Sequence, residues 1–367
     1  MSSAHGSSRY GSSSDGSGPV PSRLVDDLCW LVDIPSVTGH ERVLRDAIAD
    51  RLSGTVDVEI VGESLVAGRR VGGPRIDLYG HLDTVPENGN LPARVDERRV
   101  RGLGTSDMKA GLAVMLSALE SSAVASGPYD VVAIFYDREE GPADENGLEI
   151  VLDETAHLGD AELAVVMEPT DNELQLGCQG TINATVSFVG EAAHSARPWL
   201  GENAVTKAGE WLAEMHRREA RDVLVEGLTF KETFVVTTAS GGLARNVIPD
   251  SFAVNVNHRY PPDRSPDEAE RILAEVCAGA DGFTVVDRAP AASIPSGNPH
   301  VERLMSSGVA AVTAKTAWTD VARLTERGIP AVNFGPGEVA QAHRADESVS
   351  VDALEAGWVI LERFLTD

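Results

Sequence analysis

Short apolar runs that end in turns divide the first half of the chain into candidate strands. The segments "RIDLYG" (75–80), "DVVAIFY" (130–136) and "ELAVVM" (162–167) are bounded by turn residues, which is typical of buried strands. Between the first two lies "SDMKAGLAVMLSALESS" (106–122), which we interpret as a helix. Strands that alternate with helices predict an α/β domain with a mixed, largely parallel sheet flanked by helices.

Two helices are expected before the first of these strands. The segment "RLVDDLCWLVDIPS" (23–36) predicts a helix that ends before Pro35. The next segment, "TGHERVLRDAIADRLS" (38–53), opens with Thr38 and Glu41 at the spacing of a capping box, and apolar residues follow at helical spacing. We therefore expect a second helix whose first turn is capped by Thr38.

The pattern changes after Gly180. Apolar and polar residues alternate in 181–190 and 251–260, as they do in half-exposed antiparallel strands. The segments 203–220 and 266–280 have the pattern of amphipathic helices. This block predicts an α+β unit inserted into the α/β domain.

These patterns predict three parts of the chain. Ser or Gly fills 12 of the first 18 positions, so we interpret residues 1–22 as a disordered tail. Residues 23–179 and 289–367 are expected to form a catalytic α/β domain, and residues 180–288 an inserted lid and dimerisation domain.

Charge and cysteine content exclude several classes of partner and site. The net charge of −26, from 31 basic and 57 acidic residues, argues against nucleic acid and anionic membranes as partners. No apolar run has the length of a membrane span or the character of a signal peptide. The three cysteines have no paired spacing, so neither a disulfide framework nor a thiolate metal site is expected, and a reducing cytoplasm fits.

Each of the three buried strands ends in side chains that can bind a metal. The first is followed by His81 and Asp83, the second by Glu139 and Glu140, and the third by Glu168. Sites in open α/β sheets form at the carboxyl ends of strands, so these side chains are expected to lie together. A solvated loop remains the alternative for the Glu139–Glu140 pair alone.

Two further residues extend the candidate site. Asp107 lies in "GLGTSDMKAG", just before a helix, and His343 follows a strand and a Gly-Pro-Gly turn. A plain helix cap is the alternative for Asp107, and a surface histidine is the alternative for His343. Carboxylates and imidazoles without thiolates suit zinc, or cobalt and manganese, better than calcium.

These residues carry a resemblance to a known family. The motifs "GHLDTVP", "GTSDMKAG", "REEG", "MEP" and the late histidine resemble those of the dinuclear zinc exopeptidases, which include aminoacylases, acetylornithine deacetylases and succinyl-diaminopimelate desuccinylases. The resemblance spans residues 24–367. Within the family, "GCQGT", "HSARPWLGENA", "NVIPD", "AWTDVARL" and "FGPGEVAQAHRADE" look most like the actinobacterial desuccinylases.

The resemblance implies two zinc ions per subunit, with Co²⁺ or Mn²⁺ as substitutes. It implies that Asp107 bridges both ions. One ion would be bound in addition by His81 and Glu168, and the other by Glu140 and His343.

The resemblance also implies roles for residues that do not bind metal. Asp83 would hydrogen-bond to His81 and fix its tautomer. Glu139 would be the general base. His194 would stabilise the tetrahedral oxyanion in the partner subunit's site, with a turn histidine as the alternative.

Substrate contacts are less strongly marked in the sequence. Arg259 and Asn246 are expected to recognise a substrate carboxylate, and Thr319 and Arg197 are weaker candidates. Exposed positions on the inserted domain are the alternative for Arg259 and Asn246.

The activity that the resemblance implies is hydrolysis of N-succinyl-LL-2,6-diaminopimelate to succinate and LL-2,6-diaminopimelate, by a cytoplasmic homodimer. Another N-acyl amino acid deacylase of the acetylornithine deacetylase type, or a carboxypeptidase, is the alternative within the hydrolases. A metal-binding paralogue without turnover is the alternative of a different class.

Overall fold

The computed structural model describes residues 22–367, so the tail expected over 1–22 lies outside the described residues apart from Ser22. The largest sheet has eight strands in the order β1-β2-β6-β3-β7-β15-β8-β14. The pairs that join β6, β3, β7 and β15 are parallel, as are β8 and β14, whereas the remaining pairs are antiparallel. The strands are β1 (Asp57–Val61), β2 (Ser64–Arg69), β3 (Arg75–His81), β6 (Asp130–Tyr136), β7 (Leu163–Val166), β8 (Leu174–Leu176), β14 (Val312–Ala314) and β15 (Ala331–Asn333).

Helices cover both faces of this sheet because its strands are apolar on both sides. In β3, for example, Leu78 packs into the core on one face and Tyr79 into the core on the other. The first face is covered by α1 (Arg23–Val32), α2 (Arg42–Leu52), α3 (Ala110–Glu120), α4 (Ser122–Ala125), α9 (Pro299–Ser306) and α11 (Val351–Thr366). The second is covered by α5 (Gly147–Glu154) and α10 (Val321–Glu326). The expected α/β architecture, with a large mixed sheet between helices, is therefore confirmed.

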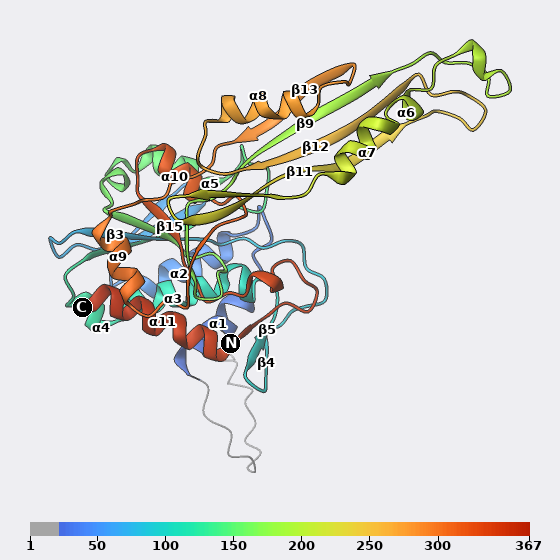
Figure 1. The fold of residues 1–367 in the computed structure, drawn as a ribbon. Helices are drawn as coiled ribbons and strands as arrows, with labels where there is room; N and C mark the ends of the chain where they lie inside the picture. The colour runs from blue at the N-terminus through green and yellow to red at the C-terminus, as the bar shows by residue number, and fades with distance from the viewer. Residues whose placement is uncertain (1–21) are drawn as a thin grey trace, which may run out of the picture.

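A second sheet has five antiparallel strands in the order β10-β11-β12-β9-β13. Its elements are β9 (Gly180–Val189), α6 (Ala204–Lys207), α7 (Gly209–Arg217), β10 (Arg221–Val225), β11 (Leu228–Gly241), β12 (Ser251–Tyr260), α8 (Pro266–Val276) and β13 (Gly282–Ala289). Alternate residues of β9 are buried against Trp211 of α7 and Leu273 of α8, as the alternating sequence predicts. We call residues 180–289 the arm and the remaining described residues the body, and Figure 1 shows the arm projecting from one side of the body.

A small three-stranded sheet, which the sequence patterns did not indicate, lies beside the metal-binding candidates. Its order is β16-β5-β4, with β4 (Arg94–Asp96), β5 (Arg99–Arg101) and β16 (Ser348–Ser350). Pairing of β16 with β5 holds the segment that follows His343 against the segment that precedes Asp107. Residues more than 200 positions apart are thereby fixed next to each other.

Two local expectations are wrong. Thr38 does not cap α2, which begins at Arg42 with Glu41 at its N-cap and no capping side chain. The Thr38 hydroxyl donates instead to Asp83 Oδ2 at 3.0 Å, so a tertiary partner has replaced the local one. The helix expected from 106 begins at Ala110, because the five residues before it form an irregular turn. No helix in residues 22–367 is long and apolar enough to cross a membrane.

Candidate metal centre

His81 is the last residue of β3, and its imidazole is fixed on both sides. Its Nδ1 lies 3.0 Å from the backbone carbonyl oxygen of Asp83, and its Nε2 lies 3.2 Å from Asp107 Oδ1. The side chain is 1% exposed. If Asp83 O accepts the Nδ1 proton, Nε2 is left with a lone pair directed at Asp107, which suits a metal ligand.

The Asp83 carboxylate holds the two glutamates that follow β6. Its Oδ1 accepts the backbone N–H of Glu139 and its Oδ2 that of Glu140, each at 3.0 Å. The Oδ1 atom lies 3.5 Å from His81 Nδ1. The expected link from Asp83 to the histidine ring therefore runs through its carbonyl oxygen at hydrogen-bond distance, while its carboxylate orients the two glutamates.

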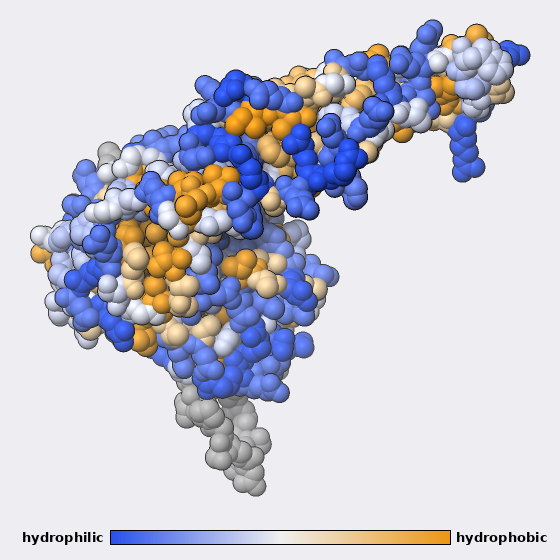
Figure 2. Space-filling view, viewed as in Figure 1, coloured by the Kyte–Doolittle hydropathy of each residue, from blue (hydrophilic) through white to orange (hydrophobic). Residues whose placement is uncertain are grey.

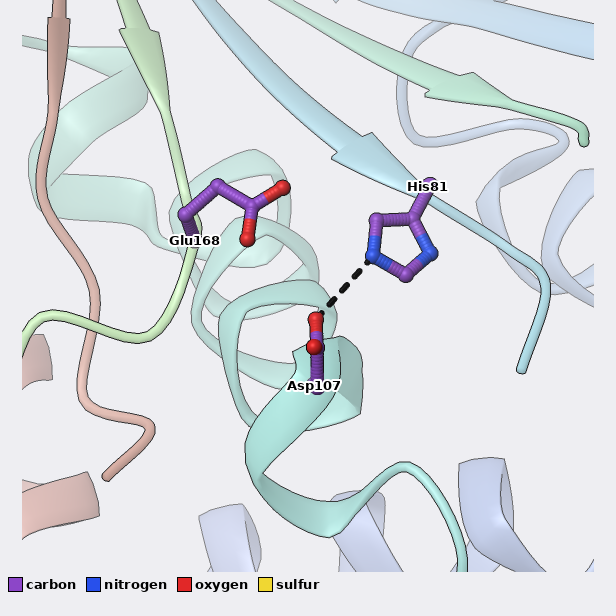
Figure 3. A group of neighbouring side chains, drawn as sticks. All are labelled: His81, Asp107 and Glu168. Atoms are coloured by element: carbon purple, nitrogen blue, oxygen red, sulfur yellow. Dashed lines mark hydrogen bonds and ion pairs between the residues drawn. The ribbon is translucent and has the colours of Figure 1, made fainter. Parts of the chain in front are cut away.

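Asp107 is at the centre of the cluster. Figure 3 shows His81, Asp107 and Glu168 directed toward one another from β3, the turn before α3 and the end of β7. On its other side, Asp107 Oδ2 lies 3.4 Å from Nε2 of His343, which in turn lies 2.8 Å from Glu140 Oε1. The two carboxylate oxygens of Asp107 thus face two different histidines.

Three groups of side chains could each hold an ion, since their ligand atoms lie within 4.8 Å of one another. They are His81, Asp107 and Glu168; Asp107, Glu140 and His343; and His81, Glu139 and Glu140. The first two groups contain the same residues as the two ligand sets implied by the resemblance, and they share Asp107. The individual metal-ligand roles remain predictions.

The electrostatics of the cluster favour a bound cation. Burial, reinforced by the Asp107 charge, raises the pKa of Glu168 to about 7, and burial raises the pKa of Glu139 well above its usual value. Burial also disfavours the charged form of Asp107, yet hydrogen bonds from His343 and His81 hold its pKa below the usual range. Divalent cations would neutralise this buried negative charge.

Three of the four predicted residues of the inserted segment lie far from this cluster. His194, Arg197 and Asn246 are exposed, and the loop that carries His194 lies at the end of the arm away from the body (Figure 1). The N–H of Ser195 donates to Asn246 O at 2.9 Å, which fastens the two loops of this end together. Within one chain, the structure does not bring these side chains to the metal-binding candidates.

Arg259 and Thr319 lie where the arm joins the body. Arg259 is paired with Thr181 near the start of β9, and its Nε donates to Asn257 Oδ1 at 3.1 Å. Thr319 is buried, and its carbonyl oxygen lies 3.9 Å from the Cys178 sulfur. Arg259 and Asn246, expected in one binding site, therefore occupy opposite ends of the arm in a single chain.

Sequence reasoning missed two buried acidic residues beside the cluster. Glu347 accepts hydrogen bonds from the backbone of the Asp107 turn. Asp320 is fully buried, and its charge contributes to the raised pKa of both Glu139 and Glu168, in each case after burial itself. Neither residue directly follows an apolar strand, which was the signal that found His81, Asp83, Glu139, Glu140 and Glu168.

Comparison with known proteins decides the family. Residues 78–367 match peptidase family M20/M25/M40. The chain belongs to this peptidase family. A Mycobacterium tuberculosis protein named as a succinyl-diaminopimelate desuccinylase is 38% identical over 340 residues, which cover 91% of this chain and 96% of that protein. A succinyl-diaminopimelate desuccinylase of Corynebacterium glutamicum is 37% identical over 92% of this chain and 94% of its own.

Solved structures of the M20 family share the fold. A tripeptidase from Staphylococcus aureus superposes with a TM-score of 0.76 at 20% identity, covering 94% of this chain and 97% of its own. A dinuclear metal-binding peptidase from Bacillus subtilis gives a TM-score of 0.65 at 17% identity, covering 94% and 96%. Together with the His/Asp/Glu cluster, family membership supports a metal-dependent hydrolase.

Proposed function

We propose that this M20 protein hydrolyses N-succinyl-LL-2,6-diaminopimelate to succinate and LL-2,6-diaminopimelate, a step of lysine and cell-wall precursor synthesis in the cytoplasm. The observation that carries the hydrolytic chemistry is the placement of Asp107 between two candidate ligand groups, with Glu139 beside them. The acyl group is inferred from the two desuccinylases that are similar over more than nine-tenths of the chain.

The donor set fits two zinc ions. It consists of three carboxylates and two imidazoles without a thiolate, and Co²⁺ or Mn²⁺ would be accepted by the same atoms. His81, Asp107 and Glu168 would hold one ion, and Asp107, Glu140 and His343 the other. When bound, the ions would polarise the scissile carbonyl and make water a nucleophile at neutral pH.

Glu139 is proposed as the general base. It is absent from the two groups that share Asp107, yet its carboxylate reaches within 4.8 Å of the ligand atoms of His81 and Glu140. Its backbone is fixed by Asp83, so the side chain is positioned to accept a proton from the attacking water and deliver it to the leaving amine. A binding protein without turnover would have no need of this free carboxylate.

The proposed enzyme is a homodimer that pairs through the arm. The far end of the arm exposes large apolar side chains, including Trp199 at 75% and Leu243 at 89%, and Figure 2 shows apolar surface reaching that end. Exposed apolar clusters of this kind favour a protein contact. In such a dimer the arm would carry His194 to the partner's metal centre, which a single chain does not do.

A panel of N-acylated substrates tests the proposal. The purified, metal-loaded protein is assayed with N-succinyl-LL-2,6-diaminopimelate, N-acetylornithine and a dipeptide, and kcat/KM is compared. Preference for the succinyl compound is expected. Equal or faster turnover of the acetyl compound would favour a deacylase of the other type, and preference for the dipeptide would favour a peptidase, a class represented by relatives that are 27–29% identical. If the protein hydrolyses none of the three substrates, the remaining alternative is a metal-binding paralogue without turnover.

A further inference from the structure

Lys315 differs from every other lysine of the chain. Lys109 is also buried, but its ammonium donates to the carbonyl oxygens of Leu31 and Ile34 at 3.0 Å each. Lys207 and Lys231, which are on the arm, donate to aspartates. Lys315 is 7% exposed, and among residues 22–367 its ammonium has no hydrogen-bond acceptor and no carboxylate within 4.0 Å.

The side chain of Lys315 is largely buried, but its ammonium is not among the buried polar atoms that lack a partner, so it is accessible to water or to a ligand. Removal of a charged group from water is compensated in native proteins by an opposite charge or by several hydrogen bonds. The chain carries a net charge of −26, so acidic partners are abundant in its sequence. None of the described acidic side chains pairs with Lys315, so its accessible ammonium is free to bind an anion from outside the chain.

The segment 315–320 joins the metal centre to the base of the arm. At one end, the N–H of Lys315 approaches Leu176 O of β8 at 3.5 Å. Further along, the indole N–H of Trp318 donates to Pro290 O, directly after β13 of the arm, at 3.2 Å. The segment ends at Asp320, whose charge reaches Glu139 and Glu168.

Lys315 lies within electrostatic range of the metal centre. Its charge is one of those that act on the Glu168 carboxylate. The cations of the proposed metal centre would already neutralise Glu168. The Lys315 charge therefore remains available for an anion that enters the site.

Arg259 is a second cation without a carboxylate partner. It is half-buried and donates only to the neutral side chain of Asn257 among the described residues. Its charge and that of Lys315 both act on the buried thiol of Cys178, so the two cations lie near the same residue. Thr319, whose carbonyl oxygen lies 3.9 Å from the Cys178 sulfur, has a buried hydroxyl without a hydrogen-bond partner in the part of the chain that the structure describes.

We propose that Lys315, together with Arg259, binds the terminal carboxylate of the substrate's acyl group. The inference rests on the proposed function, because it assigns this residue to the acyl end of that substrate. A carboxylate between the two cations would supply the missing partner of both, and the Thr319 hydroxyl could donate a further hydrogen bond to it. An acyl chain that ends in a methyl group would leave both charges without a partner, so the assignment predicts a preference for succinyl over uncharged groups.

Two N-acyl substrates of the same amine test the assignment. N-succinyl- and N-butyryl-diaminopimelate have acyl chains of the same length, and only the first ends in a carboxylate. In Lys315→Met, the ratio of kcat/KM for the succinyl over the butyryl compound should fall by about 10- to 100-fold, the usual range for a lost hydrogen bond to a charged group. Lys207→Met is the matched control and should keep the wild-type ratio, because Lys207 lies on the arm and pairs with Asp281.

A binding measurement separates this inference from the proposed function. The affinity of the metal-loaded protein for succinate and for butyrate is measured by calorimetry, which needs no turnover. Lys315→Met should weaken succinate binding and change butyrate binding much less, since both ligands have one carboxylate that the metals can attract. Lys315→Arg, which keeps the charge, should retain more of the difference, and Lys315→Gln, which also removes the charge, serves in place of the methionine variant if that variant does not fold.

The outcomes are distinct. If Lys315→Met binds succinate with the affinity of the wild type, Lys315 does not bind the acyl carboxylate. The same conclusion holds if its affinities for succinate and butyrate fall by the same factor. If succinate binding depends on Lys315 but the wild type hydrolyses no N-succinyl substrate, the anion site stands and the proposed function fails.

Discussion

The backbone N–H of Asp107 donates a 3.0 Å hydrogen bond to the carboxylate of Glu347. The same carboxylate accepts the N–H groups of Gly104 and Ser106 at 2.7 and 2.8 Å. Glu347 lies only four residues after His343, so one short segment both carries a candidate ligand and holds the turn of the shared ligand in place. A buried side chain with three such bonds fixes the direction in which Asp107 presents its oxygens.

Replacement of Glu347 by glutamine should therefore weaken metal binding. An amide offers one acceptor oxygen in place of two and directs an NH₂ group at backbone donors, so at least one of the three bonds is lost. We expect metal affinity to fall by about 10- to 100-fold, the range found when residues that orient metal ligands are changed. Titration against a coloured chelator measures it.

Glu338→Gln provides the control for this variant. Glu338 belongs to the same part of the chain but accepts from Arg99 and Ser350, neither of which is a candidate ligand. The metal affinity of Glu338→Gln should stay at the wild-type value. If Glu347→Gln binds metal with the same affinity as Glu338→Gln, the three hydrogen bonds of Glu347 do not position the metal centre.

Glu139→Gln should keep the metals and lose most of the turnover. The substitution leaves the backbone bond to Asp83 intact and removes only the group that accepts a proton, a contribution of about 10²- to 10⁴-fold. Metal content and kcat of the purified variant are compared with those of His81→Ala. A metal loss as large as that of the histidine variant would identify Glu139 as a ligand.

Removal of the metals should make stability depend on pH. In the metal-free protein, burial raises the pKa of Glu168 to about 7, and the hydrogen bond with Asp107, together with nearby charges, raises the pKa of His343 to about 9. Both groups bind protons more tightly when folded, so they contribute stability at low pH that is lost as pH rises from about 4.5 for Glu168 and from about 6.5 for His343. Asp107 has a lowered pKa and is ionised across this whole window, so it adds no slope.

Thermal denaturation with and without chelator at pH 5.5 and pH 8 tests this expectation. The Tm of the chelated protein should decrease from pH 5.5 to pH 8. The difference in Tm between the metal-loaded and the chelated protein should increase over the same range, because metal ligands must lose their protons to bind. A gap of the same size at both pH values would show that the carboxylates and imidazoles of the cluster are not the groups to which the metals bind.

The strand ends could be located from the sequence because a strand is marked by a local run of apolar residues between turns. Apolar runs mark β3, β6 and β7, and these three strands are neighbours in the sheet with parallel directions. Their carboxyl ends consequently meet at one edge, which brings His81, Glu139 and Glu168 together. The order of the strands had to come from the structure, and the roles of these three residues remain predictions.

Other features depended on contacts that sequence patterns do not encode. Thr38 and Glu41 have the spacing of a capping box, yet Thr38 finds a tertiary partner in Asp83. The bond between Glu347 and Asp107 spans 240 positions along the chain. Likewise, the lack of a partner for Lys315 is a property of its surroundings after folding, and no local pattern distinguishes it from a surface lysine.

The separation of His194 from the metal-binding candidates leads to the last prediction. In one chain His194 lies on the exposed far end of the arm, where the N–H of Ala196 donates to its Nδ1 at 3.1 Å. If it serves the partner's metal centre, each active site of the dimer combines Glu139 of one chain with His194 of the other. His194→Ala and Glu139→Ala should both be inactive alone.

Mixing these two inactive variants should restore activity. After subunit exchange, half of the dimers would contain both variants, and in each of those one site would have Glu139 and His194 intact, so about a quarter of the wild-type activity should return. Glu139→Ala mixed with His81→Ala is the control, because both residues lie in the same chain's site and no combination restores one. Recovery in the first mixture but not in the second requires that His194 act across the interface. Absence of recovery, in mixtures shown to exchange subunits, would place His194 in its own chain's site or outside catalysis altogether.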